Sequence, residues 1–210
     1  MSDLVLYTNP MSRGRIARWM LEETGQPYET EIITFGPHRT NADFLAINPM
    51  GKVPALTHGD AVVTEAPAIC AYLADAFPDA GLAPEPGSMD RAAYYRWLFF
   101  AAGPIEQAVT TQALGIAVPD DKRGMVGFGS LDLVLDTLES QLKDRDYIAT
   151  DRFTAADLYV GAHIGWGMMF GTIEKRPVFE TYFGRLSQRP AAIRAQEIDD
   201  KLVAEMQAQG

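Results

Sequence analysis

A serine near the start of an expected helix is the first residue of this sequence that could do chemistry. Ser12 follows an apolar segment at residues 4–7 and a turn at residues 8–10, where a helix N-cap is expected. The first turn of a helix carries a positive potential, and a hydroxyl there can donate a hydrogen bond to a negatively charged atom. Ser12 could therefore stabilise an anion, and a plain helix-capping role is the alternative.

Two neighbours of Ser12 bear on the same chemistry. Tyr7 ends the expected strand and offers a second hydroxyl, although aromatic residues also favour strands because they pack well there. Arg13 follows Ser12 directly and could add positive charge. Positions 8–14 hold no cysteine, so chemistry through a protein-bound mixed disulfide is not expected. We interpret the single cysteine of the chain, Cys70, as an inert core residue.

Composition narrows the classes of protein to which the chain can belong. The net charge of −10 disfavours nucleic-acid binding, which needs a basic surface. No apolar run reaches the roughly 18 residues that span a bilayer, and the first residues lack the pattern of a signal peptide. One cysteine and three widely separated histidines show no metal-ligand spacing. We therefore expect a cytoplasmic protein with no metal site, no nucleic-acid partner and no membrane partner.

The elements that must position Ser12 are predicted from periodicity and turn residues. A strand, a helix and a second strand form a β-α-β crossover unit, and a hairpin and a further helix follow it. The strands are expected at 4–7, 28–33, 55–57 and 61–63, and the helices at 12–25, from Thr40 through Leu45, and at 67–77.

Beyond this α/β part the sequence predicts helices alone. Residues 78–88 contain three prolines and two glycines, which is typical of a linker. We therefore predict a domain at 1–78, a linker at 79–88 and an all-helical domain at 89–210. The helices of the second domain are expected at about 89–109, 120–142, 154–169, 177–187 and 190–206.

Four segments in order resemble the cytosolic glutathione transferase family, with similarity over nearly the whole chain. They are the loop Leu6–Arg13, the segment Asn48–Leu56, the stretch Thr64–Ala66 and the helix start Phe153–Asp157. The resemblance implies a thioredoxin-like N-terminal domain with a mixed four-stranded sheet, followed by a helical-bundle C-terminal domain. It also points to the bacterial-type branch of the family that depends on a serine.

The resemblance implies where glutathione binds as co-substrate. The Val53–Pro54 bond is expected to be cis, so that the backbone of Val53 pairs with the cysteinyl unit as an added strand would; a trans proline in a rigid loop is the alternative. Glu65 matches the family residue that holds the γ-glutamyl end at a helix N-terminus, and could otherwise be only a helix-dipole partner. Ala66 stands where the family has a serine, so only its backbone amide remains.

The resemblance also assigns roles around the thiol. Ser12 would favour the glutathione thiolate over the thiol, with Tyr7 as the competing hydroxyl and Arg13 as added charge. Lys52 and Arg39 are candidates for binding the glycyl carboxylate, and solvated surface charge is the alternative for both.

An apolar surface on the expected helices could receive a second substrate. Tyr94, Trp97, Trp166 and Met169 would line it, and ordinary core packing is the alternative for these residues. Thr154 and Asp157 form a capping box, to which we assign a role in folding alone.

The function implied is attack of activated glutathione on a small hydrophobic electrophile by a detoxifying homodimer. Reductive dehalogenation, isomerisation and peroxide reduction would use the same thiolate. The alternative is a non-catalytic ligand-binding or regulatory protein of the same fold.

Overall fold

A computed structural model of the protein describes residues 3–34 and 42–208. By their contacts these residues form two compact units. One unit comprises the chain up to Leu82 together with the segment from Arg189 onward, and the other is Ala83–Gln188. The last helix therefore groups with the first unit, whereas the sequence-based division at 78 and 89 placed it with the helical part. That division stays a prediction about domains.

A mixed four-stranded sheet lies at the centre of the first unit, as predicted. Its strand order is β2-β1-β3-β4. The central strand β1 runs parallel to β2, with Val5 opposite Glu29, and antiparallel to β3, with Leu6 opposite Leu56. The strands are β1 (Leu4–Thr8), β2 (Glu29–Ile32), β3 (Ala55–His58) and β4 (Ala61–Thr64).

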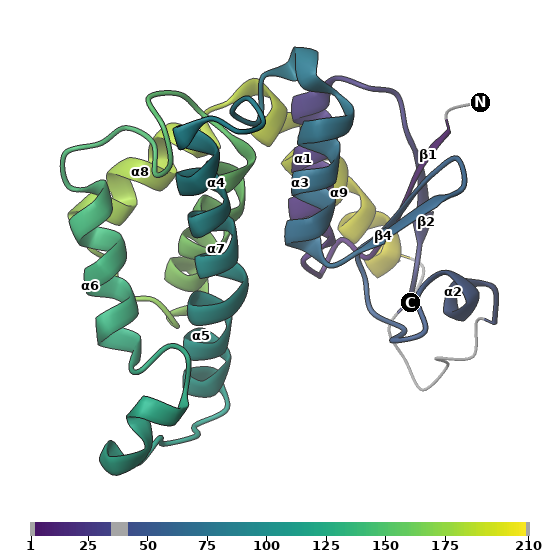
Figure 1. The fold of residues 1–210 in the computed structure, drawn as a ribbon. Coiled ribbons are helices and arrows are strands. Elements are labelled where there is room, and N and C mark those ends of the chain that lie inside the picture. Colours follow the sequence, from purple (N-terminus) through teal and green to yellow (C-terminus); the bar gives the residue numbers. More distant parts are fainter. Residues whose placement is uncertain (1–2, 35–41, 209–210) are drawn as a thin grey trace. The chain divides into compact units, whose positions relative to one another are not determined.

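Helices cover the sheet on both faces (Figure 1). On one face lie α1 (Gly14–Thr24) and α3 (Ala66–Ala76), whose apolar side chains are buried with Leu4 and Leu6 of β1. The short helix α2 (Ala42–Ile47) lies on the other face. A 3-10 turn follows α3 at Pro78–Ala80.

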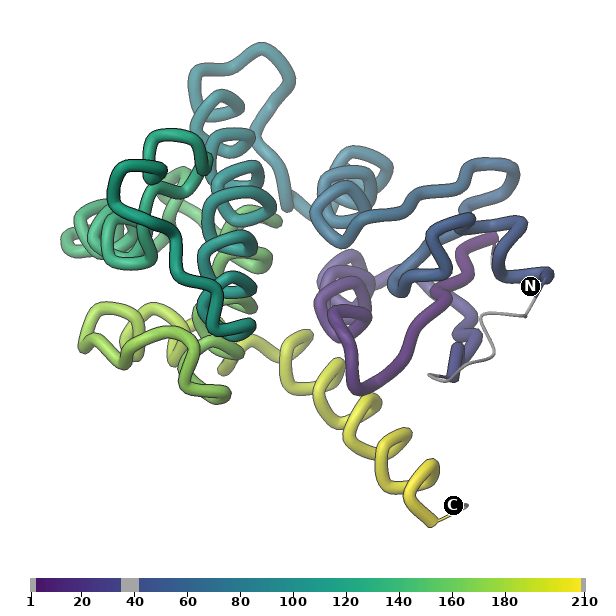
Figure 2. The backbone as a smooth tube through the Cα atoms, turned by 90° about the horizontal axis from the view of Figure 1, so that it is seen from below, coloured from purple at the N-terminus to yellow at the C-terminus, as the bar shows by residue number. Residues whose placement is uncertain are grey.

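The last helix, α9 (Pro190–Ala208), packs along α1 (Figure 2). On α3, Cys70 is fully buried, and this burial raises the pKa of its thiol well above the ordinary value. The interpretation of Cys70 as a core residue is therefore confirmed.

The second unit is helical, as predicted, and is built around one buried helix. That helix, α7 (Ala155–Phe170), packs against α4 and α8, and most of its residues are buried. The other helices of the unit are α4 (Met89–Phe100), α5 (Glu106–Ala113), α6 (Leu131–Leu142) and α8 (Pro177–Ser187).

Two predicted helices of this unit differ from the structure. The helix expected at 89–109 is interrupted by a π-helical turn, Ala101–Ile105, because Pro104 has no N–H and crowds the preceding turn. The helix expected at 120–142 begins only at Leu131. A 3-10 turn occupies Asp120–Met125, and Gly129, with φ 67°, separates it from the helix.

The described residues contain neither a helix that could span a membrane nor a cluster of metal-ligating side chains. None of the helices at 3–34 and 42–208 combines the length and the apolar character needed to cross a membrane. Within the same residues, no three His, Cys, Asp or Glu side chains gather as a metal site would require.

Candidate functional site

The loop between β1 and α1 is held by the buried side chain of Asn9. Its Nδ2 donates to the carbonyl of Ile33, 2.9 Å away, and its Oδ1 accepts from the N–H of Met11 at 2.9 Å. Asn9 thereby ties the loop to the residue that follows β2. Sequence reasoning did not single out Asn9, although asparagine is a typical turn residue whose side chain bonds to nearby backbone.

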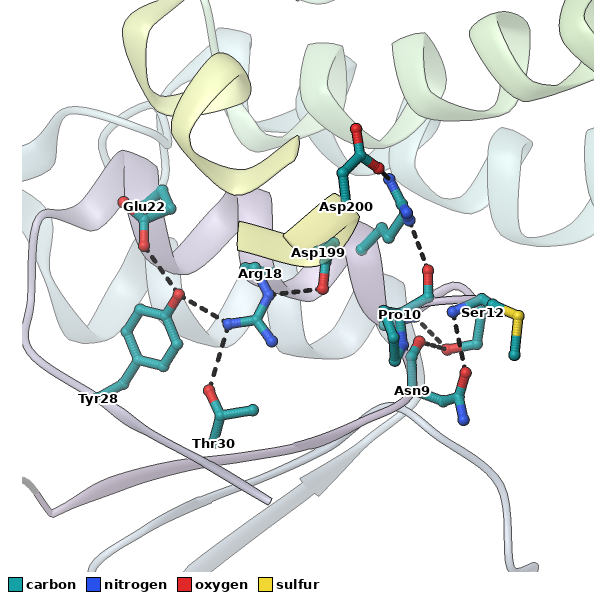
Figure 3. A network of polar contacts seen from close by, with 12 residues as sticks. Asn9, Pro10, Ser12, Arg18, Glu22, Tyr28, Thr30, Asp199 and Asp200 are labelled. Carbon is teal, nitrogen blue, oxygen red and sulfur yellow. Dashed lines mark hydrogen bonds and ion pairs between the residues drawn. The ribbon is translucent and has the colours of Figure 1, made fainter. Parts of the chain in front are cut away.

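Ser12 lies half-buried at the end of this loop, beside the first turn of α1 (Figure 3). Its Oγ is 2.7 Å from the carbonyl oxygen of Asn9 and 2.9 Å from the N–H of Gly14. A carbonyl oxygen can only accept, so the one hydroxyl hydrogen of Ser12 goes to Asn9. Ser12 Oγ can donate to a ligand only after this hydrogen rotates away from Asn9.

Ser12 precedes the helix by one residue more than expected. The N-cap position is taken by Arg13, whose side chain is exposed and whose carbonyl accepts from the N–H of Ile16 at 3.0 Å. The carbonyl of Ser12 accepts from the N–H of Arg15 at 3.2 Å. The Ser12 hydroxyl therefore lies where the positive end of the α1 dipole acts most strongly.

Gly14 lets the start of α1 approach β1 closely. A Cβ atom at this position would lie 1.8 Å from Thr8 Oγ1 and 3.0 Å from Ser12 Oγ. Thr8 is itself fully buried, so it cannot move aside without disturbing the core. Glycine at position 14 is therefore required by the spacing between strand, loop and helix.

Tyr7 points away from this junction. Side chains alternate along β1, so Leu6 and Thr8 face α1 while Tyr7 faces the opposite side of the sheet. There its ring lies 5.9 Å, centroid to centroid, from the ring of Phe44 in α2. This environment favours a packing role for Tyr7.

The Val53–Pro54 peptide bond is cis, as expected. The preceding loop is organised by Asn48, which is buried. Its Nδ2 donates to the carbonyl of Lys52 at 2.7 Å, and its Oδ1 accepts from the N–H of Met50 at 3.1 Å. Asn48 repeats here the role of Asn9 in the first loop, so each loop is fixed by one buried asparagine.

The start of α3 has an unusual backbone at Glu65. This residue has φ 66° and ψ 117°. Among the residues that the structure describes, it is the one non-glycine residue with positive φ. Such a conformation costs about 1–3 kcal/mol and persists only where the surrounding structure holds it. Glu65 is exposed, its carbonyl accepts from Ile69 at 2.9 Å, and buried Ala66 opens the helix.

The other residues predicted to contact glutathione differ in burial. Lys52 is exposed, and Val53 is half-buried beside buried Pro54. Arg39 lies outside the described residues. The glutathione contacts assigned to Lys52, Val53, Pro54, Glu65, Ala66 and Arg39 stay predictions.

The residues predicted to line a second-substrate surface belong to the second unit and differ in burial. Tyr94 and Trp97 are buried in α4, and the Trp97 ring lies 5.2 Å from that of Phe100. Trp166 is half-buried and Met169 is 71% exposed on α7. Burial of the first two is what core packing requires, and a substrate role for all four stays a prediction.

The predicted capping box at the start of α7 is present. The Asp157 carboxylate accepts from the N–H and the hydroxyl of Thr154, each at 2.9 Å. It also accepts from the N–H of Ile148 at 2.7 Å and from the hydroxyl of Tyr182 at 2.9 Å. Burial raises the pKa of Asp157, and these hydrogen bonds oppose that rise.

Comparison with known proteins decides the family. Residues 2–75 match the glutathione S-transferase N-terminal domain, and residues 107–190 match the glutathione S-transferase C-terminal domain. The chain belongs to the glutathione S-transferase family. The predicted thioredoxin-like domain followed by a helical domain is thereby confirmed.

Relatives of this glutathione transferase cover it almost end to end. Glutathione S-transferase GstA of Escherichia coli O157:H7 is 28% identical over 95% of this chain and 98% of its own length. Glutathione S-transferase 3 of Zea mays is 31% identical over 91% of this chain and 92% of its own length. The structure of a sphingomonad glutathione S-transferase complexed with glutathione has a TM-score of 0.76 and 31% identity, and covers 93% of this chain and 98% of that one.

Proposed function

We propose that this glutathione transferase holds the sulfur of glutathione as a thiolate beside Ser12 and directs it at a small hydrophobic electrophile. Its relatives are named glutathione S-transferases, and one similar structure contains glutathione. These facts support glutathione as the co-substrate. The observation that carries the role of Ser12 is its hydroxyl at the first turn of α1, in a loop fixed by Asn9.

The energy available at this position is sufficient. Lowering a thiol pKa by about two units requires about 2.7 kcal/mol. A hydrogen bond to a charged group contributes about 1.5–3 kcal/mol, and the dipole of α1 adds to it. When the Ser12 hydrogen turns from the carbonyl of Asn9 to a thiolate, a neutral acceptor is exchanged for a charged one. The exchange favours the thiolate, because charge-assisted hydrogen bonds are the stronger kind.

The rest of glutathione would extend from Ser12 across the two other segments. The backbone of Val53 would pair with the cysteinyl unit, with Pro54 shaping the turn. The γ-glutamyl end would lie beside Glu65, and its carboxylate would accept from the amide of Ala66 at the N-terminus of α3. Lys52 and Arg39 would serve the glycyl carboxylate.

The role of Ser12 is tested by comparing Ser12→Ala with Tyr7→Phe. We expect Ser12→Ala to raise the pKa of enzyme-bound glutathione by about one to two units, as loss of a charged hydrogen bond would. Tyr7→Phe should leave that pKa nearly unchanged, because Tyr7 packs on Phe44 at the opposite face of the sheet. The thiolate absorbance of the bound tripeptide, followed against pH, gives both values. A rise with Tyr7→Phe alone would transfer the role to Tyr7.

A non-catalytic ligand-binding or regulatory function is the second candidate. One observation favours it: the Ser12 hydrogen is already donated to Asn9. Turnover of an aromatic chloro-nitro electrophile in the presence of glutathione separates the two. Binding of glutathione without turnover across a broad electrophile panel would favour the second candidate.

The wider setting is proposed from the family. Membership of this family implies that the chain forms a two-fold homodimer in the cytoplasm and detoxifies small electrophiles. Light scattering of the purified chain tests the dimer through its mass in solution.

A further inference from the structure

The last helix is anchored to α1 by a buried ion pair (Figure 3). Arg18 Nε lies 2.8 Å from Asp199 Oδ1, and the two side chains are 2% and 0% exposed. The same guanidinium donates to Tyr28 Oη at 3.1 Å and to Thr30 Oγ1 at 3.2 Å. Tyr28 and Thr30 thus hold the Arg18 side chain in place, and Asp199 fixes α9 to it.

This anchor brings the next residue of α9 against the first turn of α1. Asp200 follows Asp199, and its Oδ1 lies 2.8 Å from Arg15 Nη1. Arg15 is 27% exposed and Asp200 is 54% exposed. An ion pair this exposed contributes little to overall stability. Any role of the Arg15–Asp200 pair therefore depends on the other contact that Arg15 makes.

The Arg15 guanidinium also contacts the loop that carries Ser12. Arg15 Nε donates to the carbonyl of Pro10 at 2.6 Å. Because the guanidinium is planar and rigid, holding Nη1 at Asp200 orients Nε toward Pro10. Pro10 follows Asn9, whose carbonyl accepts the hydroxyl of Ser12. A continuous series of contacts thus runs from Asp200 through Arg15 and Pro10 to Ser12.

We propose that Arg15, held by Asp200 of the last helix, is a positioning residue for Ser12. It fixes the carbonyl of Pro10 and thereby the backbone that sets the direction of the Ser12 hydroxyl and the first turn of α1. A carboxylate 188 residues further along the chain than Ser12 therefore contributes to the acidity of the bound thiol. The inference rests on the proposed function of Ser12.

The sign of one substitution separates positioning from simple electrostatics. Asp200→Ala removes a negative charge, so a through-space effect alone would lower the pKa of the bound glutathione thiol. Loss of positioning would raise it. We expect a rise of about 0.5–1 unit, in the thiolate titration and in the acidic limb of the kcat/KM profile, as partial loss of a charged hydrogen bond would give. Arg15→Ala should give a larger rise, and Arg15→Lys should restore little of it, because lysine lacks the planar fork.

Two matched controls lie on the same helix. Glu197→Ala removes an exposed carboxylate from α9, which repeats the charge change of Asp200→Ala. Arg194→Ala breaks a different tie between the helices, since Arg194 Nε lies 3.0 Å from Glu22 Oε2. We expect both controls to leave the thiol pKa as in the unsubstituted protein. An unchanged or lowered pKa with Asp200→Ala would overturn the proposal.

A second measurement distinguishes failure of the positioning role from failure of the proposed function. If the unsubstituted protein forms no glutathione thiolate, the proposed function fails, and hydrogen exchange without ligand then decides the positioning role. The N–H of Ser12 donates to Asn9 and the N–H of Gly14 donates to Ser12 Oγ. In that case both amides should exchange several-fold faster in Asp200→Ala than in Glu197→Ala. Equal rates in the two variants would overturn the positioning role.

Discussion

At the level of single residues, the hydroxyl of Ser12 has both a donor and an acceptor within the protein. The sequence predicted the position of Ser12 after β1 but not these partners, because hydrogen bonds across a loop depend on its exact course. The two asparagines that fix the loops, Asn9 and Asn48, were likewise visible only as turn residues. Residue types therefore indicated candidate positions, and the structure supplied the hydrogen bonds of the candidate Ser12.

The absence of a hydroxyl at Ala66 gives a prediction at this scale. Ala66 opens α3 beside Glu65, where the γ-glutamyl carboxylate is proposed to bind. Ala66→Ser would add one hydrogen bond, about 0.5–1.5 kcal/mol, so the affinity for glutathione should rise about two- to tenfold. Titration calorimetry measures the change. Ala68→Ser, at an exposed position of the same helix, is the control and should not alter affinity; equal affinities in both variants would contradict the proposed orientation of glutathione.

At the level of secondary structure, local signals predicted the strands and most helices well. The predicted bounds of α8, 177–187, coincide with the structure, since a proline at its first position marks the start. The predictions failed where one residue changes the local geometry. Pro104 widens a turn between α4 and α5, and Gly129 delays α6 until Ser130 can cap it. Apolar positions at helical spacing, such as Trp97, Ala101 and Ile105, continue through the first break, so periodicity alone does not reveal it.

The start of α7 allows a graded test of its cap. Thr154→Ala should lower the free energy of unfolding by about 1 kcal/mol, the usual value of an N-cap, and leave kcat unchanged. Asp157→Ala should cost more, about 3 kcal/mol or above, because it also strands the buried N–H of Ile148 and hydroxyl of Tyr182. Urea unfolding measures both. Ser130→Ala, at the exposed cap of α6, is the control and should cost no more than Thr154→Ala; equal losses for Asp157→Ala and Ser130→Ala would contradict this account.

At the level of the whole molecule, the N-terminal part of the chain and the last helix belong to one compact unit. Arg18 and Asp199 are 181 positions apart, yet they form a buried pair, and Arg189 binds Glu23 of α1 through two hydrogen bonds of 2.7 Å. Sequence reasoning predicted α9 as a helix but grouped it with the helical part. An amphipathic pattern shows that a helix has a buried face, and it does not name the partner of that face.

The buried pair predicts a non-additive effect on stability. Asp199→Ala should cost about 3–5 kcal/mol, because Arg18 would keep a buried charge with no carboxylate beside it. The double variant Arg18→Met with Asp199→Leu should recover most of that loss, since replacing a buried ion pair by apolar side chains is often neutral. Thermal and urea unfolding measure both. Asp200→Ala, at a half-exposed carboxylate, is the control and should lose less than 1 kcal/mol; a double variant no more stable than Asp199→Ala would contradict this prediction.

The burial of Cys70 has a consequence for a protein that handles reactive compounds. Its thiol is the only one in the chain. It is buried on α3, where its raised pKa keeps it in the protonated, unreactive form. Thiol-reactive compounds therefore meet no accessible cysteine thiol on this chain. While the protein stays folded, oxidised thiols in solution cannot trap it as a mixed disulfide through its own cysteine.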